Sequence, residues 1–183
     1  MKSFSDLSEQ EIIALAISSE DDDARLYSGF ANALMEAYPA SAKVFMEMSE
    51  EEHQHRHWLT DLYQKKFGDF IPLIRRSDIN GFVKHKPGWM IGKLNIEAMR
   101  QRAEVIELEN YRFYKQASAH SKDPQIAKLL AQLAEAEKGH ESLAARLVQA
   151  KESTAANIVA AAPRVDLIHP GVQKYLSEAG LLR

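Results

Sequence analysis

Apolar residues recur every three or four positions along four long stretches of the chain, a spacing that places them on one face of an α-helix. The first stretch follows Ser8 and Glu11, whose Ser-x-x-Glu spacing is typical of a helix start, and Pro39 ends it. The second covers about residues 40–67, and Gly68 is typical of the position just after a helix. The pattern predicts two long helices joined by a short turn.

The second half of the pattern repeats this arrangement. The third stretch covers about residues 95–120, where Asn95 is a suitable N-cap. The fourth covers about residues 123–152, where Asp123 can cap the helix and Pro124 fits its first position. Four helices of this length favour an up-and-down bundle over a globin-like cluster.

The connection between the two helix pairs is much longer than the two turns. Residues 69–94 are rich in proline, glycine and basic residues, as in "FIPLIRRSDINGFVKHKPGWMIGKL". A short loop, a long crossover and a second short loop are typical of ferritin-like bundles. We therefore predict an all-α, ferritin-like four-helix bundle over residues 1–152. Residues 153–183 form a C-terminal tail in which "HPGVQKYLSEAGLLR" could make a short amphipathic helix.

The composition of the chain limits the partners and the metal ligands that it can have. Hydrophobic residues make up 45% of the 183 residues and charged residues 27%, and the net charge of −3 gives no indication of a nucleic-acid partner. The absence of cysteine excludes disulfides, zinc–thiolate sites, iron–sulfur clusters and thiol nucleophiles, so any metal must be held by oxygen and imidazole. We find no signal-peptide pattern and no apolar stretch long enough to cross a bilayer, and we expect a cytoplasmic protein.

Acidic and imidazole side chains are crowded in "SEEEHQHRHWL" on the second predicted helix. Such a stretch is either a charged surface or one half of a metal site. A second half exists in "LAEAEKGHESLAARL", where Glu137 and His140 repeat the Glu-x-x-His spacing of Glu52 and His55. Residues three apart lie on one face of a helix, so each pair can reach the same metal or two adjacent metals.

The repeat extends to the first and third helices. Tyr27 and Tyr114 lie in similar contexts, and each follows a glutamate by seven positions, which are Glu20 and Glu107. Folding as two antiparallel pairs would bring four carboxylates and two imidazoles to one level of the bundle. One glutamate from each of two helices and a Glu-x-x-His pair from each of the others is the di-iron carboxylate arrangement. Such a donor set suits iron, with manganese or zinc as substitutes.

The segments "ALAISSEDDDARLYSGFA", "FIPLIRRSDINGFV", "ELENYRFY" and "LAEAEKGHESLAARL" resemble the rubrerythrin-like members of the ferritin superfamily. The resemblance covers about residues 5–150 and is nearest to the ferritin-like (erythrin) domain that some bacteria fuse to a vacuolar-iron-transporter-type membrane domain. It implies iron oxidation, storage or export and protection against peroxide. It also implies the metal ligands, which are Glu20, Glu52, His55, Glu107, Glu137 and His140.

Two features depart from this family pattern. The cysteine-ligated rubredoxin iron that serves rubrerythrins as an electron relay has no ligands here, and the fused membrane domain is not among these 183 residues. The leading prediction is a non-haem di-iron protein that oxidises Fe(II) with O₂ or hydrogen peroxide. The alternative is an iron-sensing or iron-delivery module for a membrane transporter, without significant turnover. We also expect a homodimer.

Several assignments stay open from sequence alone. Glu109 competes with Glu107 as the ligand of the third helix, although the spacing to the tyrosine favours Glu107, and Glu104 is either an auxiliary ligand or an exposed acid. The other positions have structural interpretations. We expect surface imidazoles at His53 and His57, and core tyrosines that can hydrogen-bond the ligands at Tyr27 and Tyr114. We expect a solvent-facing basic patch at Arg75 and Arg76, and packing residues at Trp58 and Trp89.

Overall fold

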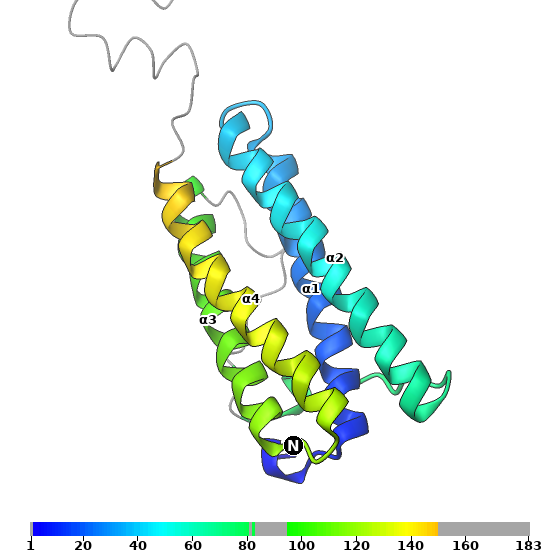
Figure 1. Cartoon of the computed structure of the whole chain (residues 1–183). Helices are drawn as coiled ribbons and strands as arrows, with labels where there is room; N and C mark the ends of the chain where they lie inside the picture. Colours follow the sequence, from blue (N-terminus) through cyan, green and yellow to red (C-terminus); the bar gives the residue numbers. More distant parts are fainter. Residues whose placement is uncertain (1, 81, 83–94, 150–183) are drawn as a thin grey trace, which may run out of the picture.

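The predicted all-α bundle is confirmed in a computed structural model, which describes residues 2–80, 82 and 95–149, with side chains up to residue 138. Four long helices form two antiparallel hairpins that pack side by side (Figure 1). Two short 3₁₀ helices, η1 (Phe4–Asp6) and η2 (Arg76–Asp78), flank them. The four helices are α1 (Glu9–Leu34), α2 (Pro39–Phe67), α3 (Ile96–His120) and α4 (Pro124–Gln149).

Local capping chemistry sets the helix ends. The Ser8 hydroxyl accepts from the Glu11 amide at 3.2 Å, and the Glu11 carboxylate accepts from the Ser8 amide at 3.0 Å. At the start of α3, the Asn95 side chain accepts from the Ala98 amide at 2.8 Å. Gly68 ends α2 with φ of 88°, a conformation that favours glycine. These contacts satisfy backbone groups that a helix end leaves without an intrahelical partner.

The second helix of each hairpin opens on a proline. Asp123 caps α4 by accepting from the Gln125 amide at 2.8 Å, and Pro124 follows as the first helical residue. Pro39 holds the same place in α2, whereas α1 already ends at Leu34. Pro39 therefore begins the second helix rather than ending the first, because its missing N–H has no role in a first turn. The predicted tail, residues 153–183, lies outside the described residues.

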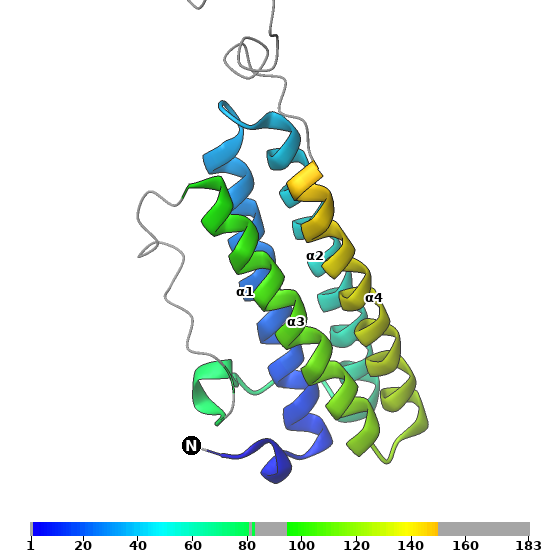
Figure 2. The ribbon, with the colours of Figure 1, turned by 90° about the vertical axis from the view of Figure 1, so that its left-hand side faces the viewer.

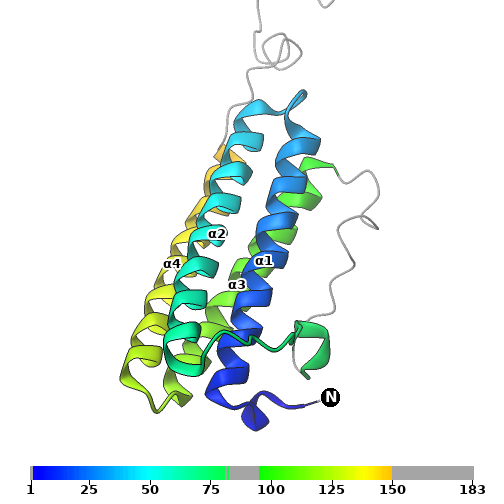
Figure 3. The same ribbon diagram turned by 90° about the vertical axis from the view of Figure 1, so that its right-hand side faces the viewer.

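The connection between the hairpins joins opposite ends of the bundle. The end of α2 lies at the end of the bundle where α1 begins, while α3 begins at the opposite end (Figures 2 and 3). The described part of this crossover passes across α1, where Ser18 donates to the Ile74 carbonyl. The Asn80 amide donates to the Lys2 carbonyl at 2.9 Å. The crossover is thus held against α1, and its length gives the predicted ferritin-like connectivity.

Two apolar clusters lie along the bundle with polar residues between them. On α1, residues 12–16 belong to one cluster and Tyr27 to Leu34 to the other. The residues between include buried Ser19, Glu20 and Asp23. The same order holds on α2 and α3, so the buried polar groups share one level of the core. Burial of this many ionisable groups indicates a functional site rather than a packing layer.

Candidate metal centre

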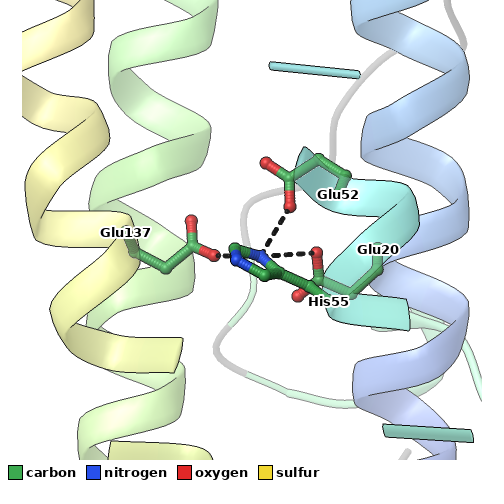
Figure 4. A group of neighbouring side chains, drawn as sticks. All are labelled: Glu20, Glu52, His55 and Glu137. Carbon is green, nitrogen blue, oxygen red and sulfur yellow. Dashed lines mark hydrogen bonds and ion pairs between the residues drawn. The ribbon is translucent and has the colours of Figure 1, made fainter. Parts of the chain in front are cut away.

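Four of the six predicted ligands meet in the core. Glu20 comes from α1, Glu52 and His55 from α2, and Glu137 from α4 (Figure 4). Each offers one ligand atom, and these atoms all lie within 4.8 Å of one another. The three glutamates have no exposed surface and His55 is 5% exposed. Charged side chains are rarely buried this completely unless they are paired or bind a metal.

The His55 ring lies at the centre of this cluster. Its Nδ1 atom lies 3.2 Å from Glu52 Oε2, 3.5 Å from Glu137 Oε1 and 3.8 Å from Glu20 Oε2. One ring nitrogen can donate only one proton, and the contact to Glu20 is too long for a hydrogen bond. Three carboxylate oxygens therefore lie around one ring nitrogen, and together these four atoms form a donor set that suits a metal cation.

Two tyrosines link the duplicated halves, because each donates a hydrogen bond to a glutamate of the other helix pair. Tyr27 on α1 donates to Glu107 Oε1 on α3 at 2.5 Å, and Tyr114 on α3 donates to Glu20 on α1. Burial and the charge of the neighbouring glutamate raise the pKa of both phenols well above the ordinary value. Both hydroxyls therefore stay protonated and act as donors, which gives these core residues the second role that the sequence allowed.

The helix-three alternatives differ sharply in burial. Glu107 is fully buried, Glu109 is partly exposed and Glu104 is exposed. The spacing to the tyrosine thus selects the carboxylate that faces the core. His140 belongs to α4, one turn beyond Glu137, but its side chain lies outside the described residues. Its role as a ligand stays a prediction.

A paired substitution tests the helix-three assignment. Glu107→Ala should lower the number of tightly bound metal ions, because it removes a buried carboxylate from the centre. Glu109→Ala should leave that number unchanged, because the side chain is partly exposed and points along another face. Metal analysis after equilibration with Fe(II) under anaerobic conditions measures both. A full complement of metal in Glu107→Ala would exclude Glu107 as a ligand.

Comparison with known proteins agrees with this geometry. The sequence profile of the family described as Rubrerythrin matches residues 11–148. The chain belongs to the rubrerythrin family. A solved structure of a hypothetical protein from Pyrococcus furiosus is similar in fold, with a TM-score of 0.65 and 21% sequence identity over 80% of this chain and 94% of that one. A search of curated proteins gave no significant match. Within the described residues, no helix is both long and apolar enough to cross a membrane.

Protonation differs among the glutamates of this rubrerythrin-family site. Burial raises the pKa of Glu52 and Glu137 well above the ordinary value, and the charges of neighbouring carboxylates raise it further. Burial also acts to raise the pKa of Glu20, but hydrogen bonds from Glu52, His55 and Tyr114 outweigh it and leave that pKa lowered. Without metal, Glu52 and Glu137 therefore hold a proton more readily than Glu20, and a metal ion that binds there would compete with it.

The donor set fits two divalent metal ions. Four buried carboxyl groups balance four positive charges, and oxygen with imidazole suits iron or manganese. Two phenols, one imidazole and one amide among the described side chains contact these carboxyl groups. The residues present in this rubrerythrin-family chain thus match the requirements of a two-metal centre.

Sequence reasoning missed a second layer of the site. Buried Asp23 and Asn110 lie three residues after Glu20 and Glu107, on the same helix faces. Arg76, expected to face solvent, instead turns inward, and its side chain is 14% exposed and contacts both of them. The sequence could have indicated Asp23 and Asn110, because the tyrosine spacing that aligns the two halves also aligns these two residues. It gave no such indication for Arg76.

The tryptophan next to the site also differs from the prediction. Trp58 is 46% exposed rather than packed in the core, and its ring centroid lies 5.7 Å from that of His55. The expected surface imidazoles of His53 and His57 are exposed. An exposed indole beside a candidate ligand gives a spectroscopic view of the centre without any added label.

Binding of a paramagnetic metal should quench the fluorescence of Trp58. In a Trp89→Phe background, cobalt(II) or iron(II) should lower the emission in proportion to bound metal, because the indole lies next to His55. The same background with Glu137→Ala, which removes a predicted ligand, serves as the control and should respond much less. Equal quenching with and without Glu137 would show that the metal binds away from this centre.

Proposed function

We propose that this chain is a non-haem di-iron protein that oxidises Fe(II) with O₂ or hydrogen peroxide. The ligands of the proposed centre are Glu20, Glu52, His55, Glu107, Glu137 and His140. One observation carries the proposal: Glu20, Glu52, His55 and Glu137, which come from three helices, bring ligand atoms to within 4.8 Å of one another in a fully buried place. Membership of the rubrerythrin family supports iron as the metal.

The surrounding side chains prepare this place for metal and oxidant. The hydroxyls of Tyr27 and Tyr114 each hold one carboxylate oxygen of Glu107 and Glu20, which orients the remaining oxygen of each. Apolar clusters on both sides exclude bulk water and strengthen electrostatic interactions at the centre. When bound, two Fe(II) ions supply one electron each, enough to reduce one hydrogen peroxide to water with two protons.

Protons are available at the site itself. Glu52 and Glu137 carry raised pKa values without metal, so binding of metal releases protons from them. Reduction of peroxide consumes protons, and carboxyl groups beside the centre can exchange them. A peroxidase cycle would also need a reductant, which must be external because the chain has no cysteine for a rubredoxin-type relay. Ferroxidase activity needs no such partner.

Fe(II) oxidation kinetics test the proposal. Purified protein is freed of metal, loaded with two equivalents of Fe(II) without oxygen, and mixed rapidly with O₂ or hydrogen peroxide. Fe(III) formation well above the rate of protein-free iron is expected with at least one oxidant. Tight binding of iron with no acceleration by either oxidant would instead favour the alternative, an iron-sensing or iron-delivery module for a membrane transporter.

Other features of the proposed protein await their own tests. A homodimer, a cytoplasmic location and a functional unit ending near residue 152 remain proposals. Residues 153–183 and Trp89, whose apolar side chains motivated the dimer, lie outside the described residues. The molecular mass in light scattering measures the oligomeric state directly.

A further inference from the structure

The duplicated halves of the site differ at one buried position. Asp23 follows Glu20 by three residues on α1, and Asn110 follows Glu107 by three residues on α3. The two side chains touch, with Asn110 Nδ2 3.1 Å from Asp23 Oδ2. They are 2% and 3% exposed. The internal repeat therefore places an anion in one half and a neutral amide in the other.

Arg76 from the crossover joins these two residues. Its Nη1 donates to Asp23 Oδ1 at 2.8 Å, and its Nη2 donates to Asp23 Oδ2 at 2.5 Å and to Asn110 Oδ1 at 2.7 Å. A guanidinium can only donate, so the Asn110 oxygen must face Arg76 and the Asn110 amide nitrogen must face away from it. The arginine thus fixes the orientation of the asparagine side chain.

The amide nitrogen, oriented in this way, points toward the metal centre. Asn110 Nδ2 lies 3.5 Å from Glu137 Oε2, a long hydrogen bond, while Glu137 Oε1 faces His55. The equivalent position in the other half holds Asp23, whose two carboxylate oxygens accept from Arg76. The repeat therefore supplies an amide donor to the Glu-x-x-His pair of α4 and places a carboxylate at the equivalent position of the other half.

We propose that Arg76, Asp23 and Asn110 form a positioning network that orients Glu137 and makes the two metal positions of the duplicated site unequal in affinity. The inference rests on the proposed two-metal centre. Side chains that orient metal ligands typically change metal affinity by 10–100-fold when they are replaced. The network also connects the crossover, through Arg76 and Asn110, to Glu137 on α4.

Two substitutions separate positioning from simple stability. Asn110→Leu keeps the approximate shape of the side chain and leaves the Arg76–Asp23 ion pair in place, but removes the amide donor. Arg76→Lys keeps a positive charge beside Asp23, yet a single ammonium cannot reproduce the planar fork that joins Asp23 to Asn110. Arg75→Lys is the matched control, because Arg75 is the exposed neighbour.

Titration of the metal-free full-length chain with cobalt(II), followed by visible absorption, measures the two binding steps. We expect two unequal steps in the wild type. Asn110→Leu and Arg76→Lys should both weaken the same single step by about 10-fold or more and change its cobalt spectrum. Arg75→Lys should match the wild type. Thermal melting of the same metal-free samples shows how much each substitution affects folding.

The proposal is overturned if both variants bind cobalt with wild-type constants, or if both steps weaken equally in proportion to a lower melting temperature. A reciprocal double variant, Asp23→Asn with Asn110→Asp, keeps the charge around Arg76 and serves if Asn110→Leu fails to fold. It should also weaken the step that depends on Glu137. Wild-type protein that binds two cobalt ions but does not oxidise Fe(II) would contradict the proposed function and leave the network testable.

Discussion

Glu52→Ala and Glu137→Ala should each abolish the binding of two metal ions, whereas Glu50→Ala and Glu135→Ala should leave it nearly intact. Glu52 and Glu137 are fully buried and meet at His55. Removing either takes away a ligand and one of the four negative charges that balance two divalent ions. Glu50 and Glu135 lie two residues earlier on the same helices and are exposed. The comparison therefore holds residue type, helix and local sequence nearly constant.

Iron analysis after anaerobic loading and desalting measures the stoichiometry of each variant. Circular dichroism must show the same helical content in all four, so that loss of metal is not loss of fold. The expected result is two ions in the exposed-site variants and at most one in the buried-site variants. Two tightly bound ions in Glu137→Ala would contradict the assignment of Glu137 as a ligand and, with it, the internal duplication as a guide to the centre.

The helix ends could be predicted from sequence because their causes are local. Ser8 and Glu11 form both halves of a capping box three residues apart, and Asn95 caps α3 with its own side chain. Gly68 adopts the positive φ expected of a residue that ends a helix. Such contacts depend on residues within one turn, so the sequence window that contains them is enough. Pro39 was assigned to the wrong helix, because proline disrupts a helix interior but is accepted in a first turn.

The buried glutamates of the candidate site could be predicted because the sequence pattern occurs twice. A Glu-x-x-His pair alone is compatible with a charged surface, but two such pairs with matched glutamates upstream require one common level in a bundle. In "SEDDD", Glu20 and Asp23 are buried whereas Asp22 is exposed, which shows how helical phase turns acids three residues apart toward the core. The register also distinguished Glu107 from Glu109, which differ in burial as expected for residues on different faces.

Arg76 could not be placed by the same reasoning. It lies in a connection without helical periodicity, so nothing in the local pattern says which way its side chain points. Its partners Asp23 and Asn110 are 53 and 34 residues away. The ion pair exists because the crossover is held against α1, a consequence of the fold as a whole. A basic pair in a loop was therefore interpreted as a surface feature, when one member, Arg75, is exposed and the other is not.

The thermal stability of the metal-free protein should fall as pH rises above about 5. Glu52 and Glu137 have pKa values raised well above the ordinary 4.5, first by burial and then by nearby carboxylates. A carboxyl group with a raised pKa binds more protons in the folded state than in the unfolded state, so its contribution to stability is lost as pH rises through the folded pKa. Glu20, with a lowered pKa, has the opposite dependence, but its window lies below pH 4.5.

Divalent metal should reverse this dependence on pH. The metal binds ionised carboxylates and neutral imidazole, so its affinity increases as protons leave the ligands. A metal ion that binds only the folded state, at 100 times its dissociation constant, adds ~2.7 kcal/mol to the free energy of unfolding. For a chain of this size, that is a rise of roughly 5–11 °C in melting temperature. The gain should be largest near neutral pH and should shrink below about pH 5, where protons compete for the same oxygens.

Melting curves of metal-free and manganese-loaded protein between about pH 5 and 8 test both predictions, because they give the change of melting temperature with pH in each state. Manganese(II) avoids oxidation during heating and has the same preference for oxygen and imidazole ligands. The two series should diverge as pH rises, because the same two carboxyl groups lower the stability of the metal-free protein when ionised and bind the metal in that state. Glu135→Ala, at an exposed glutamate, should reproduce the divergence, and Glu137→Ala should lose it. Equal melting temperatures with and without metal at pH 7 would mean that the buried glutamates do not form a metal site, and the acidic and imidazole pattern would then need a structural explanation.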